Sequence, residues 1–239
     1  MIFLLLLSFS CSKAPQKDAA ELRAQYIREG MTAYGDEDYD EAIEKLKKAF
    51  KLDTTSSPIA YNIACCYSLQ NNVDSAVSWI NRTIDLGTYS FSQDSDFDNI
   101  RESEGFKEAT VRAESLLVIA KEKDWPAYIF EPEDYDVEKK YPVLIMLHGF
   151  GSSPEDFTGD FVDIITEEGF IFVVPYGTEI YGMTSFGWGE YEEVEEKIMD
   201  EINNLKEKYS IDTSRIVLAG FSQGGGRTFS TILRNPERF

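Results

Sequence analysis

The sequence has few of the residues from which metal sites and disulfide frameworks are built. It contains one histidine, His148, and three cysteines among 239 residues. Metals such as zinc are held largely by clusters of His and Cys, and three cysteines do not make a disulfide framework. We therefore expect no metal site and no cofactor. We also expect the adjacent Cys65 and Cys66 to act as small core residues.

Basic residues are also scarce. The chain has 23 Lys and Arg against 43 Asp and Glu, which gives a formal net charge of −20. Nucleic acids and anionic membrane surfaces are polyanions, so this balance argues against both as partners. The simplest interpretation of the excess is a solvated acidic surface.

The apolar run at residues 2–9 is too short to span a bilayer, which takes about 20 residues, but its length suits the hydrophobic part of a secretory signal. Polar sequence begins around Cys11. The arrangement resembles a bacterial lipoprotein signal, which implies an extracytoplasmic protein attached to the membrane by a lipid on Cys11. An ordinary cleaved signal or a disordered tail is the alternative. We assign residues 1–17 to this segment and a short tether.

Residues 18–123 contain no convincing strand, but they do contain a repeat of about 34 residues. Ala42 recurs as Ala76, and Leu46 recurs as Ile80. Small side chains at the first position let paired helices approach closely, and large apolar ones at the second fill the space between them. The pattern therefore predicts a helical-repeat domain.

These residues resemble two tetratricopeptide repeats, at about 24–57 and 58–91, followed by a closing helix at 103–123. The resemblance implies a groove for a peptide or protein partner. The alternative is a spacer that packs on the next domain. Groove-facing residues cannot be identified without a partner, so both interpretations stay open.

From residue 124 onward, short apolar runs alternate with amphipathic stretches. Strands that alternate with helices form a mainly parallel sheet with helices on both faces, and ligands bind at the carboxyl ends of such strands. We expect strands at residues 127–131, 143–147, 170–174 and 216–219, and helices at residues 157–168, 192–209 and 223–234.

The last of these strands runs into Gly220-Phe221-Ser222-Gln223-Gly224, which is a Gly-x-Ser-x-Gly nucleophile elbow. A strand that turns abruptly into a helix strains its central residue, so its neighbours must be too small to clash. The helix N-terminus beyond the turn directs N–H groups towards a developing oxyanion. A plain Gly/Ser turn is the alternative.

The sequence His148-Gly149-Phe150 follows the strand at 143–147. Together with the elbow it resembles the α/β-hydrolases of the carboxylesterase and phospholipase/thioesterase kind. The resemblance implies that Ser222 is the nucleophile and that the backbone N–H groups of Gln223 and Phe150 form the oxyanion hole. His148 and Gly149 would support the oxyanion loop.

The same resemblance implies that the loop at residues 176–191, including Trp188, helps to wall the substrate pocket. The reaction implied is transfer of an acyl group from a small ester or thioester to water through an acyl-enzyme on Ser222.

The triad of this family runs Ser, then Asp or Glu, then His. No histidine follows Ser222, and His148 precedes it in the wrong order for a general base. We therefore expect an inactive fragment of a serine hydrolase. Its fold is α + α/β, with a tetratricopeptide-like domain at 18–123 and the N-terminal half of a doubly wound α/β-hydrolase sheet at 124–239.

Two other interpretations stay open. One is a repeat-based binding scaffold whose hydrolase domain has degenerated, which the missing acid and base favour and the intact elbow disfavours. The other is an acyltransferase that uses the same acyl-enzyme.

Overall fold

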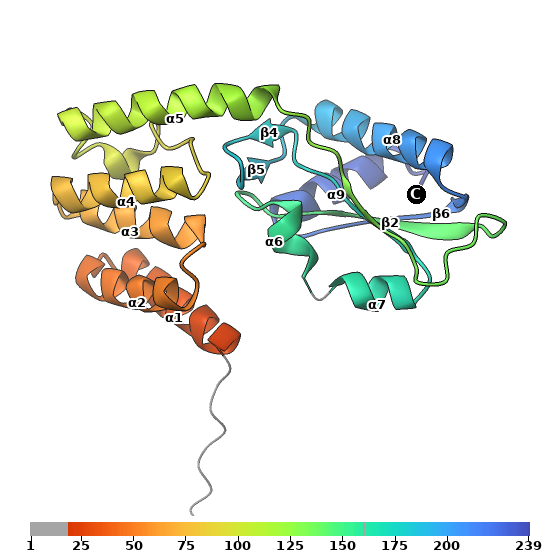
Figure 1. Cartoon of the computed structure of the whole chain (residues 1–239), viewed down its shortest axis with the longest axis horizontal. Helices are drawn as coiled ribbons and strands as arrows, with labels where there is room; N and C mark the ends of the chain where they lie inside the picture. The colour runs from red at the N-terminus through yellow and green to blue at the C-terminus, as the bar shows by residue number, and fades with distance from the viewer. Residues whose placement is uncertain (1–18, 160) are drawn as a thin grey trace, which may run out of the picture.

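The computed structural model describes residues 19–159 and 161–239, which form a helical domain and a sheet-containing domain beside each other (Figure 1). The signal-like segment at 1–17, with its predicted lipid site at Cys11, lies outside the described residues. Across the part of the chain that is described, no helix has the length and apolar character needed to cross a membrane.

The helical domain begins with two helix pairs that correspond to the two predicted repeats. An aspartate in the first repeat and an asparagine in the second occupy equivalent positions. Asp38 accepts a hydrogen bond from the backbone of Glu41, and Asn72 accepts one from Ser75, so each caps the second helix of its pair. The four helices are α1 (Ala19–Gly35), α2 (Tyr39–Leu52), α3 (Ser57–Leu69) and α4 (Val73–Asp85).

Small residues set the distance between these helices, as the repeat pattern predicts. A Cβ on Gly30 would lie 2.9 Å from Cγ of Leu46, so α1 approaches α2 as closely as a glycine allows. Ala42, Ala76 and Ile80 are buried, as is Leu46. Cys65 and Cys66 are free thiols in the same core, as expected.

The helical domain ends with the short helix η1 (Ser95–Phe97) and the long helix α5 (Glu104–Glu122). Aromatic residues fill the space that they enclose, with Phe97 against Phe106 and Phe91. Figure 1 shows α5 running along the top of the repeats and reaching the sheet domain at its end.

The sheet domain contains a four-stranded sheet in the order β1-β3-β2-β6. The strand β2 pairs in parallel with both of its neighbours, and only β1 is antiparallel, so the prediction of a mainly parallel sheet is confirmed. The strands are β1 (Tyr128–Phe130), β2 (Tyr141–Leu147), β3 (Ile171–Val174) and β6 (Ile211–Gly220).

The helices α8 (Tyr191–Lys208) and α9 (Gln223–Arg234) cover one face of this sheet. Alternate residues of β2 point into the core beneath them, because successive strand side chains face opposite sides. Figure 1 shows α7 (Phe161–Glu167) on the side of the sheet away from α8. The core under α8 contains Val143, Ile145 and Leu147 of β2 with Val194, Ile198, Ile202 and Leu205 of α8.

One helix prediction was wrong. The single helix expected at 157–168 is two short ones, α6 (Pro154–Thr158) and α7, separated at Gly159. Gly159 has a φ of 33°, a backbone conformation that residues other than glycine rarely adopt. This conformation ends α6. In α7, Phe161 and Ile164 are exposed, so its apolar face is not buried in the core.

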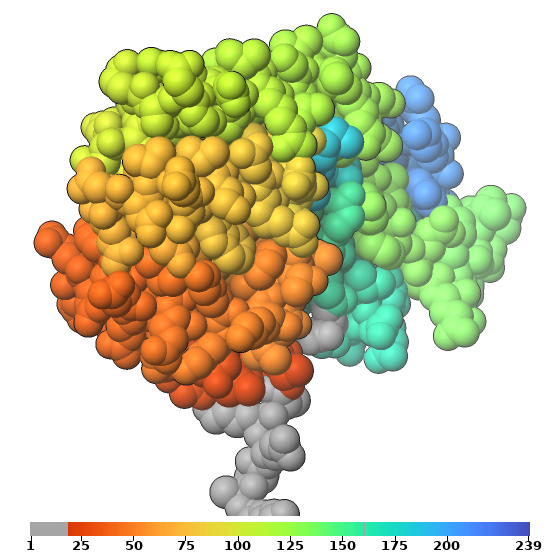
Figure 2. Space-filling model, turned by 60° about the vertical axis from the view of Figure 1, so that its left-hand side comes forward, coloured from red at the N-terminus to blue at the C-terminus, as the bar shows by residue number. Residues whose placement is uncertain are grey.

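The two domains meet where the loop at residues 86–90 lies against residues 181–185. The latter connect the short strands β4 (Glu179–Ile180) and β5 (Phe186–Gly187). The backbone N–H groups of Tyr89 and Ser90 donate to the Tyr181 carbonyl, at 2.8 and 3.1 Å. The Met183 N–H donates in return to the Gly87 carbonyl at 2.7 Å. We call these two facing segments the domain junction. Figure 2 shows the repeats packed directly against the sheet domain along this side.

Candidate active site

Ser222 sits at the sharp turn between β6 and α9. Its φ is 51° and its ψ is −118°, a combination that costs a non-glycine residue about 1–3 kcal/mol. A Cβ on Gly220 would lie 2.6 Å from the backbone of Gly224, and a Cβ on Gly224 would lie 2.4 Å from the carbonyl oxygens of Leu147 and His148. The two glycines therefore let the strand, the turn and the helix approach closely enough to present Ser222, whose side chain is exposed.

The loop that begins at His148 lies beside this turn. The Phe221 N–H donates to the Leu147 carbonyl at 3.0 Å, and a Cβ on Gly149 would lie 3.6 Å from Cβ of Ser222. Phe150 follows Gly149 directly. The structure therefore brings together the predicted nucleophile and the predicted oxyanion loop from segments that are far apart in the sequence.

Gln223 ties a third segment to the turn. Its side-chain oxygen accepts from the Trp188 N–H at 3.1 Å, and its side-chain nitrogen donates to the Trp188 carbonyl at 3.2 Å. Gln223 is also the first residue of α9, so its own backbone N–H has no acceptor within the helix. The side chain thus positions the loop at 176–191, and the backbone N–H remains suited to an oxyanion.

The structure corrects the expectation that Trp188 lines the substrate pocket. Its side chain is fully buried, it lies 5.0 Å from the His148 ring, and its indole N–H donates to the His148 carbonyl at 2.8 Å. Trp188 is thus a buried support for the start of the predicted oxyanion loop. The sequence could not show this, because an aromatic residue in a glycine-rich loop suits a pocket wall and a buried support equally well.

His148 is buried beside Trp188. Its Nδ1 lies 2.8 Å from the Gly149 carbonyl, a contact in which Nδ1 donates. Burial lowers the pKa of His148, so the ring is neutral near pH 7. Its Nε2 has no partner among the described residues. These contacts suit the predicted role of His148 in supporting the predicted oxyanion loop. No hydrogen bond joins His148 to Ser222 in the described part of the chain.

One group of potential metal ligands exists among the described residues. Atoms of Cys65, Asp94 and Asp96 lie within 4.8 Å of one another. Tyr61 donates to the Asp94 carboxylate and Tyr34 donates to that of Asp96. Burial raises the pKa of the Cys65 thiol, which keeps it protonated. Each carboxylate thus already accepts a hydrogen bond from a tyrosine, so the group is a half-buried hydrogen-bonded cluster at the repeat core.

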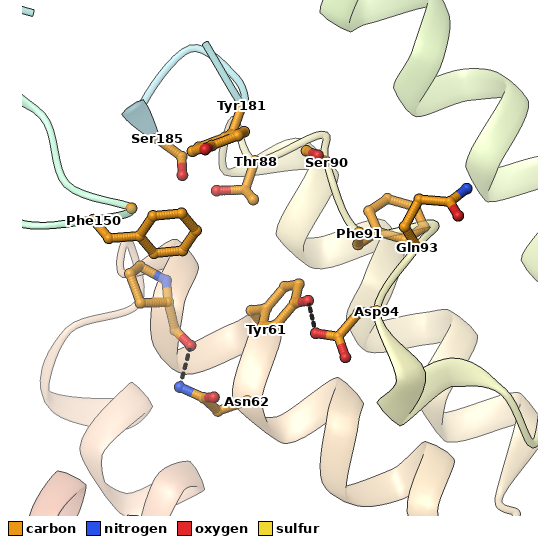
Figure 3. Close-up of a pocket in the computed structure, with 12 residues that line it drawn as sticks. Tyr61, Asn62, Thr88, Ser90, Phe91, Gln93, Asp94, Phe150, Tyr181 and Ser185 are labelled. Atoms are coloured by element: carbon orange, nitrogen blue, oxygen red, sulfur yellow. Dashed lines mark hydrogen bonds between the residues drawn. The ribbon is translucent and has the colours of Figure 1, made fainter. Parts of the chain in front are cut away.

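Sequence reasoning missed a cavity of about 540 Å³ between the domains. It adjoins the oxyanion loop through Phe150 and is shown in Figure 3. The cavity combines residues from both domains, so no motif within one segment could reveal it. The lining residues are Pro58, Tyr61, Asn62, Thr88, Ser90, Phe91, Gln93 and Asp94 from the repeat side, and Phe150, Gly151, Tyr181 and Ser185 from the sheet side.

Comparison with known proteins agrees with this architecture. Residues 134–239 match the family model described as Phospholipase/Carboxylesterase, and residues 33–86 match the one described as Tetratricopeptide repeat. The chain therefore joins a segment similar to tetratricopeptide repeats to a segment similar to the Phospholipase/Carboxylesterase family.

Individual relatives cover limited parts of the chain. A bifunctional acetylxylan esterase/xylanase, XynS20E, from Neocallimastix patriciarum is 31% identical over 38% of this chain and 13% of its own length. A chloroplastic protein of Arabidopsis thaliana is 29% identical over 38% of this chain and 29% of its own length. The chain therefore spans less than a third of either curated relative.

Among solved structures, a ferulic acid esterase from Anaeromyces mucronatus is 27% identical over 44% of this chain and 46% of that chain, with a TM-score of 0.35.

Proposed function

We propose that the α/β-hydrolase domain is a serine esterase in which Oγ of Ser222 is the nucleophile. The observation that carries this proposal is the conformation of Ser222, which is strained and exposed with the oxyanion loop against its Cβ. A strained residue persists only where the surrounding structure enforces it, and such residues concentrate at active sites. The match to the carboxylesterase family supports the same conclusion.

In the proposed reaction, Oγ of Ser222 attacks the ester carbonyl carbon and forms a new C–O bond. The N–H groups of Gln223 and Phe150 stabilise the negative charge that develops on the carbonyl oxygen. The bond to the leaving group then breaks, and the leaving alcohol takes up the proton that Ser222 loses. Water attacks the acyl-enzyme, releases the carboxylic acid and restores the serine.

The substrate class that we infer is a small uncharged ester, with thioesters included. The formal net charge of −20 repels anionic esters. One relative is itself named for an esterase activity, on acetylxylan.

We also propose that the protein acts outside the cytoplasm, held at a membrane by a lipid on Cys11, and that its repeats contact a protein partner. Metabolic labelling with a radioactive fatty acid tests the first point. Labelling of the wild type that is lost in Cys11→Ser supports it, and equal labelling of both chains contradicts it.

A fluorophosphonate probe tests the esterase proposal directly, because it reacts with activated serines. We expect the full gene product to be labelled, Ser222→Ala to lose the label and Ser230→Ala to keep it. Ser230 lies on the same helix α9, so it controls for a change in folding. Labelling that survives in Ser222→Ala would overturn the assignment of the nucleophile.

The second candidate is a binding scaffold. It is favoured by one observation: although Ser222 is the residue before α9, its side chain makes no capping hydrogen bond to that helix, and in the described part of the chain the buried His148 has no partner at Nε2. A full gene product that folds but takes no label from the probe, at any pH between 6 and 9, would favour it over the esterase.

A further inference from the structure

The cavity at the domain junction is connected to the proposed nucleophile through the loop that begins at His148, although Ser222 itself does not line it. Phe150 links the two places, because its neighbour Gly149 packs against Ser222 while Phe150 itself lines the cavity. The Phe150 side chain is exposed and lies 5.2 Å from the Tyr181 ring. Figure 3 shows Phe150 and Tyr61 reaching towards the same space from opposite domains. A group bound in the cavity would therefore contact Phe150, the residue whose backbone N–H is proposed as an oxyanion donor.

The cavity is preformed by the domain junction. The hydrogen bonds among Gly87, Tyr89, Tyr181 and Met183 fix the segments that carry the upper wall. A Cβ on Gly182 would lie 1.9 Å from the Gly87 carbonyl, so the two backbones are in direct contact. The wall contributed by the repeats is therefore held in place against the hydrolase domain, and a ligand need not order it on binding.

The chemistry of the lining selects against negative charge. Among the described residues, no Lys or Arg lines the cavity, and Asp94 is its one carboxylate. Burial raises the pKa of Tyr61, so its hydroxyl stays protonated and donates to Asp94. An anionic ligand would find no cation here and would face the Asp94 charge.

The remaining lining combines flat apolar surfaces with uncharged hydrogen-bonding groups. Aromatic rings present faces of negative potential to which C–H groups are attracted. Hydroxyl and amide side chains supply both donors and acceptors. The rings are those of Tyr61, Phe91, Phe150 and Tyr181, and the uncharged polar side chains are those of Asn62, Thr88, Ser90, Gln93 and Ser185.

We propose that this cavity is a subsite of the esterase that binds an uncharged, hydroxylated ring of the substrate, so that the tetratricopeptide repeats form one wall of the substrate site. The proposal rests on the proposed esterase function. It assigns Tyr61 as a substrate-positioning residue contributed by the repeats. A sugar ring and a hydroxylated aromatic ring both have the required chemistry, and the experiment below distinguishes them.

Binding is measured on the full chain carrying Ser222→Ala, so that no turnover intervenes. The probes are methyl glucoside, resorcinol and methyl glucuronide, followed by saturation-transfer NMR titration. We expect one of the two neutral rings to bind saturably, and the glucuronide to bind at least about tenfold more weakly than the glucoside if the sugar is preferred. Equal binding of the glucoside and the glucuronide would contradict the charge argument.

Two pairs of variants locate the binding. Ser90→Trp fills the cavity, and its matched control Ser115→Trp places the same side chain on the exposed side of α5. Tyr61→Leu removes a ring that Tyr61→Phe keeps. We expect Ser90→Trp and Tyr61→Leu to weaken binding by about tenfold or more, and the two controls to change it by less than about threefold. Failure of both rings to bind, or equal effects of the two Trp variants, would overturn the proposal.

Kinetics on the full gene product separate this proposal from the esterase proposal. We expect Ser90→Trp to lower kcat/KM about tenfold for the acetyl ester of the preferred ring and less than about twofold for ethyl acetate. Ring binding without probe labelling of Ser222 would reject the esterase and leave the cavity as a ring-binding site without the proposed catalytic role. Labelling without ring binding would reject the subsite and leave the esterase standing.

Discussion

Two sides of the sheet domain differ in what covers them: one flank packs against the repeats and the other flank is exposed to solvent. On one flank, the domain junction joins the sheet domain to the repeats through backbone hydrogen bonds, and Trp125 packs at 4.8 Å from the rings of Tyr176 and Phe186. On the other flank, β6 is the outer strand of the sheet, and the residues around it are open to solvent. Large apolar side chains lie exposed there, namely Val217, Phe221, Phe229 and Leu233.

The difference shows what the repeats do for the fold. Outer strands present unpaired backbone groups and are sites of unwanted association unless something covers them. The repeats pack against the side of the sheet domain that carries residues 181–185. Around β6 and α9, exposed apolar side chains leave a surface available to another polypeptide segment.

The largest effect on stability is expected at the β6–α9 turn, which adjoins the open flank. Gly224→Ala would place a Cβ 2.4 Å from the Leu147 and His148 carbonyls and should lower the free energy of unfolding by about 3 kcal/mol. The control is Gly226→Ala, which meets nothing within 4 Å on the same helix and should raise it by up to about 1 kcal/mol. Urea titration measures both. Equal stability of the two variants would show that the close packing of the elbow is unimportant.

The next effect is expected at the domain junction. Gly182→Ala would force the 181–185 segment away from Gly87 and should cost about 2 kcal/mol, because several backbone hydrogen bonds lengthen together. We also expect faster amide exchange at Tyr89 and Met183, which hydrogen-exchange mass spectrometry detects. Protection that stays at the wild-type level would mean that the junction does not depend on this contact.

A smaller effect concerns pH and His148, the one histidine of the sequence, which is buried beside Trp188. Burial lowers its pKa from the ordinary 6.5, so the unfolded chain takes up a proton that the folded chain refuses. Stability should therefore fall as the pH drops below about 6.5, by at most about 1.4 kcal/mol per pH unit. His148→Phe keeps a ring against Trp188 and should flatten the dependence of Tm between pH 7.5 and 5.5. A slope that the variant leaves unchanged would contradict this account.

The smallest effect on stability is expected on the open flank itself. Phe229→Lys should change the free energy of unfolding by less than about 0.5 kcal/mol, because the side chain is already 65% exposed. It should, however, reduce self-association, as measured by sedimentation velocity. Val111→Lys, at an equally exposed position on α5, is the matched control and should leave association unchanged. An identical response of the two variants would remove the distinction between the flanks.

The elements that the sequence predicted well are those encoded by local patterns. The repeat period located α2 and α4 because the buried positions Ala42, Ala76, Leu46 and Ile80 recur in register. The β6–α9 turn was predictable because only glycine fits at two of its positions. The catalytic roles of Ser222, Phe150 and Gln223 stay predictions, although the structure places the three residues together.

What could not be predicted depends on contacts between distant segments. Trp188 is a buried support because Gln223 and His148, both remote in sequence, bind its backbone and its indole. The cavity at the junction needs Tyr61 and Phe150 to meet from different domains. The break at Gly159 was missed because the apolar spacing continues through it, while the backbone conformation does not.

The path of the chain through α5 has a mechanical consequence. The polypeptide leaves the repeats along α5, enters the sheet domain at Trp125, and is tied back to the repeats at residues 86–90. The two bodies are thus fastened at two separate points. Two connections leave the domains free to rotate only about the line that joins the connections. The backbone hydrogen bonds at the domain junction resist that rotation. The two domains should therefore rotate little relative to each other, less than two domains joined only by a single flexible linker.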